Sequence, residues 1–342
     1  MSVSPGAAPA RATVTAEPGR GRRRSGKRRR SGLRHHAELA LFRLGAGALA
    51  IQPAAAARRA GRTAAKLAFG LIPSRRRILF ENLAAAFPGM PAEEIASIAD
   101  SSIAGFASAL VDFLDTARLS REELLSRVSV VGAGHLAAAR ARGKGVFLLS
   151  AHLGSWEIGA LVAGLLGEAI APVVRPLDNP LLEEELARRR RRFGNRPIAK
   201  KEAAKELLHA IARNETVAIL VDQNVLPREA VFVPFFGRLA ATTPSLARIQ
   251  LKTGAAVIPV FTWPEGEGRY RLEFEAPILA EEFGGPEVDR DERVRRATAR
   301  YMEVTEAAIR RDPAAWLWIH DRWKTKPSER PPSPEPRVPG RQ

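Results

Sequence analysis

Between residues 128 and 311 the chain alternates short apolar runs with segments of helical period, and this alternation restricts its fold most strongly. A short apolar run between turn-forming residues is typical of a strand, whereas apolar residues three and four apart are typical of a helix. Strands are expected at 128–131, 145–150, 171–175, 197–199, 217–221, 256–261 and 270–274. Helices are expected at 134–142, 158–166, 181–192, 202–212, 244–253 and 291–311. The pattern predicts an α/β fold with a mostly parallel central sheet flanked by helices.

The N-terminal part of the chain has a different composition. Residues 1–36 hold ten Lys or Arg and one acidic residue without an apolar period, which predicts a disordered basic tail. Residues 37–51 are apolar and helix-prone, but this run is too short and too charged to predict a spanning helix. We expect 37–115 to form a helical, membrane-associated segment, with the run at 37–51 lying in the interface. The alternative is a soluble packing helix that follows a solvated charged tail.

The remaining boundaries and the overall composition limit the kind of protein further. Residues 116–325 are expected to form the α/β domain, and the proline-rich residues 326–342 to be disordered. The formal net charge of +17 indicates acidic partners, such as nucleic acid, anionic lipid headgroups or an acidic carrier protein. Because the chain has no cysteine, it has no disulfide, thiol nucleophile or cysteine-ligated metal.

A polar octet, residues 150–157, joins the apolar run 145–149 to the buried helix expected at 158–166. It places His152 and Glu157 five residues apart, and on one continuous helix such a pair would point about 140° apart. We therefore expect a turn that brings the two side chains together. Gly154 allows that turn, and Ser155 is expected to cap the helix that follows.

The same octet has a chemical interpretation. Glu157 in the first helical turn lies near the positive helix end, which favours its ionised form. A carboxylate beside an imidazole fixes its tautomer and raises its basicity, as in general-base catalysis. The alternative is a histidine satisfied in the core and a glutamate in a surface turn. The octet alone leaves both interpretations open.

Other polar residues follow strands of the predicted sheet. Arg175 ends the strand at 171–175, Asp222 and Gln223 follow the strand at 217–221, and Thr243 precedes a helix. Since parallel strands place their carboxyl ends at one edge, these residues are expected near His152. Arg188 to Arg192 form a basic run, which is either a solvated helix face or a dock for phosphate or an acidic carrier.

Several rival chemistries lack their motifs in this sequence. There is no Gly-x-Gly-x-x-Gly after a strand, no Walker A loop and no His-Glu-x-x-His. There is also no Gly-x-Ser-x-Gly elbow, so a serine nucleophile is not favoured. No basic motif with interleaved aromatic residues is visible, and we expect no nucleic-acid partner for the folded part. No metal and no cofactor are expected.

Taken in order, these residues resemble the bacterial lipid A biosynthesis (lauroyl/myristoyl) acyltransferases, within the wider glycerolipid acyltransferase group. The family's His-x-x-x-x-Glu motif after a strand is similar to His152…Glu157, and the resemblance spans about 37–326. Pro244 stands where the family often has glycine. Asp321 stands where a second arginine is common, which puts a phosphate contact at that position in doubt. Further matching positions are Arg76, Arg77, Ile78, Glu81, Asn82, Leu83, Phe87, Pro88, Arg175, Asn179, Pro180, Asp222, Gln223, Phe235, Phe236, Gly237, Thr243, Thr253, Gly254, Ala255, Trp318, Arg322, Trp323 and Lys324.

The resemblance implies roles for these residues. His152 would deprotonate an acceptor hydroxyl, which then attacks an acyl thioester directly, and Glu157 would orient the imidazole. Arg175 would stabilise oxyanion charge or an acceptor phosphate. The substrate-binding residues that it implies are Arg175, Asn179, Asp222, Gln223, Phe236, Gly237, Thr243 and Arg322.

The resemblance also implies partners and a location. Acyl-carrier protein would be the donor, with acyl-CoA as the alternative, and a lipid A precursor would be the acceptor. The mycobacterial phosphatidylinositol mannoside acyltransferases share the motif, so another glycolipid acceptor stays open. The enzyme would act at the membrane surface, on the cytoplasmic face of the inner membrane. The rival class is a non-enzymatic binder of anionic polymers, which the basic charge alone suggests.

Overall fold

A seven-stranded sheet forms the centre of the computed structural model, which describes residues 20–166, 169–199 and 203–327. Its strand order is β1-β9-β8-β2-β5-β3-β4. Neighbouring strands are parallel except for the antiparallel pair β8–β9. The prediction of a mostly parallel sheet is therefore confirmed. The strands are β1 (Val128–Val131), β2 (Val146–Ser150), β3 (Ile170–Val174), β4 (Ile198–Ala199), β5 (Thr216–Leu220), β8 (Ala256–Pro264) and β9 (Tyr270–Phe274).

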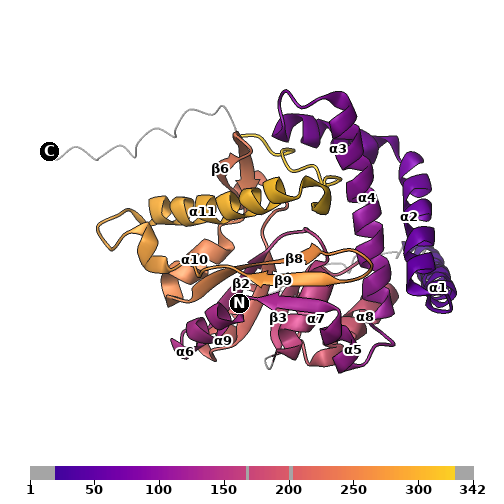
Figure 1. The fold of residues 1–342 in the computed structure, drawn as a ribbon, viewed down its shortest axis with the longest axis horizontal. Coiled ribbons are helices and arrows are strands. Elements are labelled where there is room, and N and C mark those ends of the chain that lie inside the picture. Colours follow the sequence, from indigo (N-terminus) through magenta and orange to yellow (C-terminus); the bar gives the residue numbers. More distant parts are fainter. Residues whose placement is uncertain (1–19, 167–168, 200–202, 328–342) are drawn as a thin grey trace, which may run out of the picture.

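Helices cover both faces of this sheet, as Figure 1 shows for α11 on one side and α7 on the other. Alternate residues of β2 supply the two apolar layers, because successive side chains of a strand point to opposite faces. Phe147 and Leu149 belong to the layer under α9, α10 and α11, whereas Val146 and Leu148 belong to the layer under α6 and α7. The helices are α5 (Arg121–Ser126), α6 (Ala133–Ala141), α7 (Trp156–Leu165), α8 (Pro180–Arg190), α9 (Ala203–Ala212), α10 (Ser245–Thr253) and α11 (Arg290–Arg311).

The N-terminal helices lie along one side of the sheet domain (Figure 1). They are α1 (Arg20–Ala50), α2 (Ala54–Gly70), α3 (Pro73–Ala86) and α4 (Ala92–Asp115). Helix α1 begins inside the tail for which the sequence predicts disorder, and arginine is a good helix former. The rest of that tail, residues 1–19, and most of the proline-rich end, from residue 328, lie outside the described residues. The domain limits at 36, 115 and 325 stay predictions.

The N-terminal helices also expose apolar surface, which fits a membrane-associated segment. Among the described helices, α4 is long and apolar enough to cross a bilayer, but it also packs against α2 and α3. A packed core helix passes the same test of length and composition. Large apolar side chains stand exposed on and beside α1 and α2: Leu33, Leu41, Leu44, Ile51, Leu67, Leu71 and Ile72.

A two-stranded hairpin, β6 (Val231–Phe235) with β7 (Arg238–Thr242), was not expected from the sequence. Its turn residues Phe236 and Gly237 have φ angles of 52° and 71°. Positive φ at both central residues is the geometry that suits a tight hairpin, and glycine or asparagine usually supplies it. Because phenylalanine stands at one of these positions, the sequence did not indicate the turn.

Candidate active site

The octet forms the predicted turn between β2 and α7. Gly154 has a φ of +57°, and a Cβ at this position would lie 1.9 Å from the carbonyl oxygen of Thr262. The Gly154 N–H donates to Ala315 O at 2.8 Å, and the Ser155 N–H donates to Thr262 O at 3.2 Å. The turn is therefore fixed between β8 and the C-terminal segment. The Ser155 hydroxyl makes no capping hydrogen bond, which corrects the sequence expectation.

Asp222 is the hydrogen-bond partner of the His152 imidazole. His152 Nδ1 lies 2.9 Å from Asp222 Oδ1, and the His152 N–H donates to Asp222 Oδ2 at 2.8 Å. The indole N–H of Trp316 donates to the same Oδ2 at 2.8 Å. Asp222 follows β5, the strand paired with β2, so the sheet brings the two residues together. With the carboxylate accepting from Nδ1–H, the lone pair of the neutral imidazole lies on Nε2.

Burial and charge act in opposite directions on this pair. Burial acts to raise the pKa of Asp222, but the His152 charge and the hydrogen bonds from His152 and Trp316 hold it well below its usual range. Burial likewise acts to lower the pKa of His152, and the Asp222 carboxylate outweighs it, so the pKa is raised. The arrangement stabilises an imidazolium and increases the basicity of Nε2.

Glu157 pairs with an arginine instead of the imidazole. Its carboxylate accepts from Arg190 Nε at 3.0 Å and from an Arg190 terminal nitrogen at 2.6 Å. The expectation that Glu157 holds the imidazole ring is therefore corrected, because Asp222 occupies that position. Glu157 nevertheless contributes charge that raises the pKa of His152. Arg190 belongs to the basic run and is the member that lines the cavity, with its side chain 16% exposed.

A cavity of about 920 Å³ opens at His152. Its walls extend over both faces of the sheet, with Leu148 and Ala218 on the α7 side and Ile219 and Ile249 on the α10 side. The Nε2 atom of His152 lies 3.2 Å from the side-chain amide of Gln223, which also lines the cavity. The polar lining consists of Ser150, His152, Glu157, Arg175, Arg190, Gln223, Asn224, Thr243, Ser245, Arg248, Thr262 and His320.

Three of the expected substrate-binding residues line this cavity beside His152 and Glu157: Arg175, Gln223 and Thr243. Arg175 directly follows β3, is exposed, and makes no ion pair with any described residue. Thr243 precedes α10, and its hydroxyl bonds the Ser245 hydroxyl at 3.0 Å. The strand-end argument accounts for Arg175 and Gln223, which follow β3 and β5, whereas Thr243 follows β7 of the hairpin.

Of the other expected substrate-binding residues, Asp222 contacts His152, and the remaining four have structural contacts away from the cavity. Asn179 caps α8, and its amide donates to His35 O and Glu38 of α1 at 3.0 and 2.8 Å. Phe236 and Gly237 form the hairpin turn. Arg322 is fully buried and donates to Ala241 O at 2.7 Å and to the Thr242 hydroxyl at 2.6 Å.

His320, Arg190 and Arg248 line the cavity, but the sequence did not assign them a role there. His320 Nε2 accepts the Asn224 N–H at 2.9 Å. The signal in the sequence was the position of His320 between Trp318 and Arg322 and, for Arg190, its place in the basic run at 188–192. Within the described residues, no three His, Asp or Glu side chains are grouped as ligands for a metal ion.

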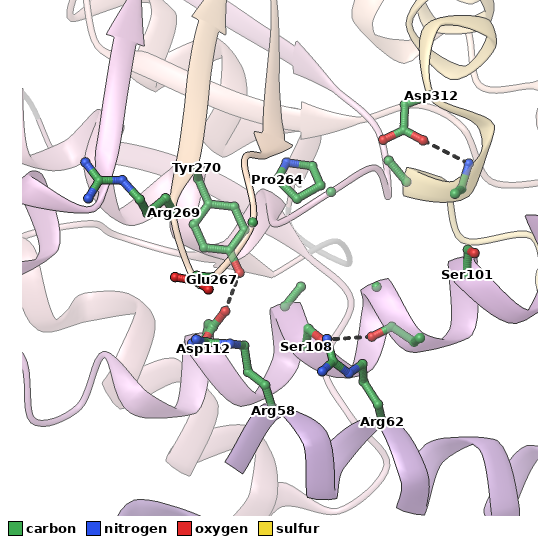
Figure 2. A pocket seen from close by; sticks show the side chains of 18 residues that line it. Arg58, Arg62, Ser101, Ser108, Asp112, Pro264, Glu267, Arg269, Tyr270 and Asp312 are labelled. Carbon is green, nitrogen blue, oxygen red and sulfur yellow. Dashed lines mark hydrogen bonds and ion pairs between the residues drawn. The ribbon is translucent and has the colours of Figure 1, made fainter. Parts of the chain in front are cut away.

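A smaller cavity, of about 330 Å³, lies on the other side of the Gly154 turn, between α2, α4 and the β8–β9 turn. Figure 2 shows the Tyr270 hydroxyl pointing at Asp112, with Arg58 beside the same carboxylate. The two contacts measure 2.6 and 3.0 Å. Burial, followed by the Asp112 charge, raises the pKa of Tyr270. These buried polar groups satisfy one another and join the N-terminal helices to the sheet.

Comparison with known proteins identifies the family. The sequence pattern described as bacterial lipid A biosynthesis acyltransferase matches residues 28–325. The chain is 29% identical to the lipid A biosynthesis lauroyltransferase of Escherichia coli K12, over 77% of this chain and 83% of that protein. It is 28% identical to a lipid A biosynthesis acyltransferase of Haemophilus influenzae, over 76% and 80% of the two chains. It is also 28% identical to the palmitoleoyltransferase of E. coli K12, over 74% and 80%. The chain therefore belongs to the bacterial lipid A biosynthesis acyltransferase family and is an O-acyltransferase.

Proposed function

We propose that this protein transfers a fatty acyl chain from an acyl thioester to a hydroxyl group of a lipid A precursor, with His152 as the general base. The observation that carries this proposal is the His152–Asp222 pair, whose imidazole lines a cavity of about 920 Å³. The pair leaves a basic Nε2 at the cavity surface, as proton abstraction from a bound hydroxyl requires. Membership of the family, and the names of its relatives, support the choice of reaction and acceptor.

The reaction needs no covalent intermediate on the protein. His152 Nε2 takes the proton of the acceptor hydroxyl while the hydroxyl oxygen attacks the thioester carbonyl carbon. The carbonyl π pair moves to the oxygen, and its return breaks the C–S bond. The leaving thiolate then takes the proton from the imidazolium, which ionised Asp222 has stabilised in the meantime.

The rest of the cavity suits the two substrates. The Gln223 amide donates to Nε2 in the free enzyme, and the acceptor hydroxyl would displace it. Arg175, which has no carboxylate partner among the described residues, would bind an acceptor phosphate or developing oxyanion charge. The Glu157–Arg190 pair holds a second cation at the cavity wall. The apolar walls, which include Leu148, would take the acyl chain.

Charge and exposed apolar surface support the proposed donor and location. An acidic acyl-carrier protein suits a chain with a net charge of +17, and acyl-CoA is the alternative donor. The exposed leucines of α1 and α2, which include Leu41, Leu44 and Leu67, suit the cytoplasmic surface of the inner membrane.

The decisive experiment compares His152→Ala with wild type in the transfer of a labelled acyl chain to a lipid A precursor. His135→Ala is the matched control, because His135 is exposed on α6 and does not line the cavity. We expect the loss of transfer in His152→Ala alone. Retained transfer in purified His152→Ala would refute the assignment. Parallel reactions with acyl-carrier-protein and CoA thioesters identify the donor, and mass spectrometry of lipids from a deletion strain identifies the acceptor.

A second experiment separates this function from anionic-polymer binding. Glutamine is substituted for the seven basic residues at 22–24 and 27–30. Acyl transfer should persist in this variant, whereas binding to nucleic acid through these charges should disappear. Loss of transfer without loss of folding would show that the charges serve the reaction itself.

A further inference from the structure

A second histidine, His320, lines the cavity and has no part in the mechanism above. Its Nε2 accepts the backbone N–H of Asn224 at 2.9 Å. Asn224 follows Gln223, the residue in contact with His152 Nε2. The loop after β5 thus contacts one histidine through Gln223 and the other through Asn224.

The hydrogen bond from Asn224 decides the tautomer of His320. An N–H donor at Nε2 requires a lone pair there, so the neutral ring carries its proton on Nδ1. Burial lowers the pKa of His320. The charge of Asp222 acts to raise this pKa, whereas the charges of His152 and Arg322 act to lower it. The ring is therefore a neutral donor near physiological pH, and it is a weaker base than His152.

The Nδ1–H of His320 has no hydrogen-bond partner among the described residues. Seven side-chain polar atoms of the described residues are fully buried without a hydrogen-bond partner, and His320 Nδ1 is not one of them. The Nδ1 atom is therefore not enclosed by protein, and the residue that carries it lines the cavity. A fixed N–H beside a basic histidine matches what acyl transfer requires, because negative charge develops on the carbonyl oxygen as the hydroxyl attacks.

The ring also has a rigid support. Asn82 Nδ2 donates to His320 O at 2.7 Å. The Asn224 side chain exchanges two hydrogen bonds with Thr325, at 3.0 and 3.2 Å, so the loop and the C-terminal segment hold each other. A donor held in place before the reaction costs little reorganisation when charge develops.

We propose that His320 donates a hydrogen bond from Nδ1 to the carbonyl oxygen of the acyl thioester, while His152 takes the proton of the acceptor hydroxyl. This assignment rests on the proposed acyl transfer and adds a catalytic residue to it. His320 transfers no proton: the carbonyl oxygen gains the π pair, is stabilised by Nδ1–H, and returns the pair when the C–S bond breaks. His152 thus acts as the base, and His320 acts as the hydrogen-bond donor to the oxyanion.

Two substitutions separate this role from a structural one. In His320→Gln, the side-chain oxygen reaches the Nε2 position and still accepts the Asn224 N–H, but no donor remains at the Nδ1 position. In His320→Asn, the amide supplies a donor near the Nδ1 position, but the acceptor for Asn224 is lost. Both variants are assayed for kcat, KM and thermal unfolding with a labelled acyl thioester.

We expect His320→Gln to unfold near the wild-type temperature and to lose about 10²- to 10³-fold in kcat, the usual effect of removing one oxyanion donor. His320→Asn should be less stable and yet retain more kcat than His320→Gln. A kcat of His320→Gln within about threefold of wild type would overturn the inference, as would equal loss in both variants. Because His152→Ala is assayed in parallel, activity in that variant would mark a failure of the proposed function instead.

Discussion

His152 and Asp222 lie 70 positions apart in the chain, and the imidazole Nδ1 of the one is 2.9 Å from the carboxylate of the other. The pairing of β2 with β5 produces this contact, because His152 and Asp222 each follow the end of one of these strands. Two further hydrogen bonds, from the His152 N–H and the Trp316 indole, fix the carboxylate. The orientation of the base therefore depends on the tertiary structure of the sheet.

Asp222→Asn should lower kcat/KM by roughly 10²- to 10⁴-fold, since a neutral amide does not stabilise the imidazolium and permits the wrong tautomer. Asp100→Asn is the control, because Asp100 is exposed on α4 and its carboxylate forms an ion pair with the exposed Lys66. Initial rates with a labelled donor measure the effect. A rate for Asp222→Asn close to that of Asp100→Asn would contradict the assigned role.

The acid limb of the pH profile should lie above pH 6.5, the ordinary pKa of histidine, in the wild-type enzyme. His152 must be neutral to accept a proton, and Asp222 raises its pKa, so activity is lost as the pH falls through that raised value. In Asp222→Asn, the burial that lowers the pKa of His152 remains, and of the opposing charges only the smaller contribution of Glu157 is left. Its acid limb should therefore move to lower pH, and kcat/KM measured against pH shows the direction.

Glu157 and Arg190 should act as one unit. Their bidentate contact is partly buried, with side chains 22% and 16% exposed, so removing either partner leaves the other charge unpaired. We expect Glu157→Gln and Arg190→Gln each to lower kcat/KM, and the double variant to lose less than the product of the two effects. A coupling of about 0.5–3 kcal/mol is typical of contacting residues. Strictly multiplicative losses in this double-mutant cycle would show that the two residues act independently.

Gly154→Ala should destabilise the protein by more than about 2 kcal/mol, because it adds strain at positive φ and a clash with Thr262 O. Gly134→Ala on α6 is the matched control, since its Cβ would meet nothing within 4 Å. Chemical denaturation compares the two variants with wild type. If both lost the same stability, the close approach at Gly154 would not be the cause.

Local patterns in the sequence were sufficient to predict most strands of the sheet. The strands expected at 128–131 and 270–274 have the observed limits, and most others differ by one or two residues. Burial in a parallel sheet requires continuous apolar runs, and these are visible in the residues themselves. The hairpin β6–β7 was missed because Phe236 adopts a backbone conformation that its residue type does not favour.

The candidate site likewise has residues that the sequence predicted and contacts that it did not predict. His152, the Gly154 turn and the strand-end residues Arg175 and Gln223 were predicted, because each depends on its immediate neighbours and on the common edge of parallel strands. The structural contacts of Asn179 and Arg322 were not predicted, because their partners belong to α1 and β7, which are distant in the chain.

The sequence by itself determined the type of sheet, the position of the basic histidine and the reaction class that its residue pattern resembles. Only the tertiary structure decided which groups meet: Asp222 with His152, Arg190 with Glu157, and His320 with the cavity. The physical reason is the short range of the hydrogen bond, which acts over about 3 Å. Strand order and helix packing bring distant residues within that range, and spacing along the chain does not reveal them.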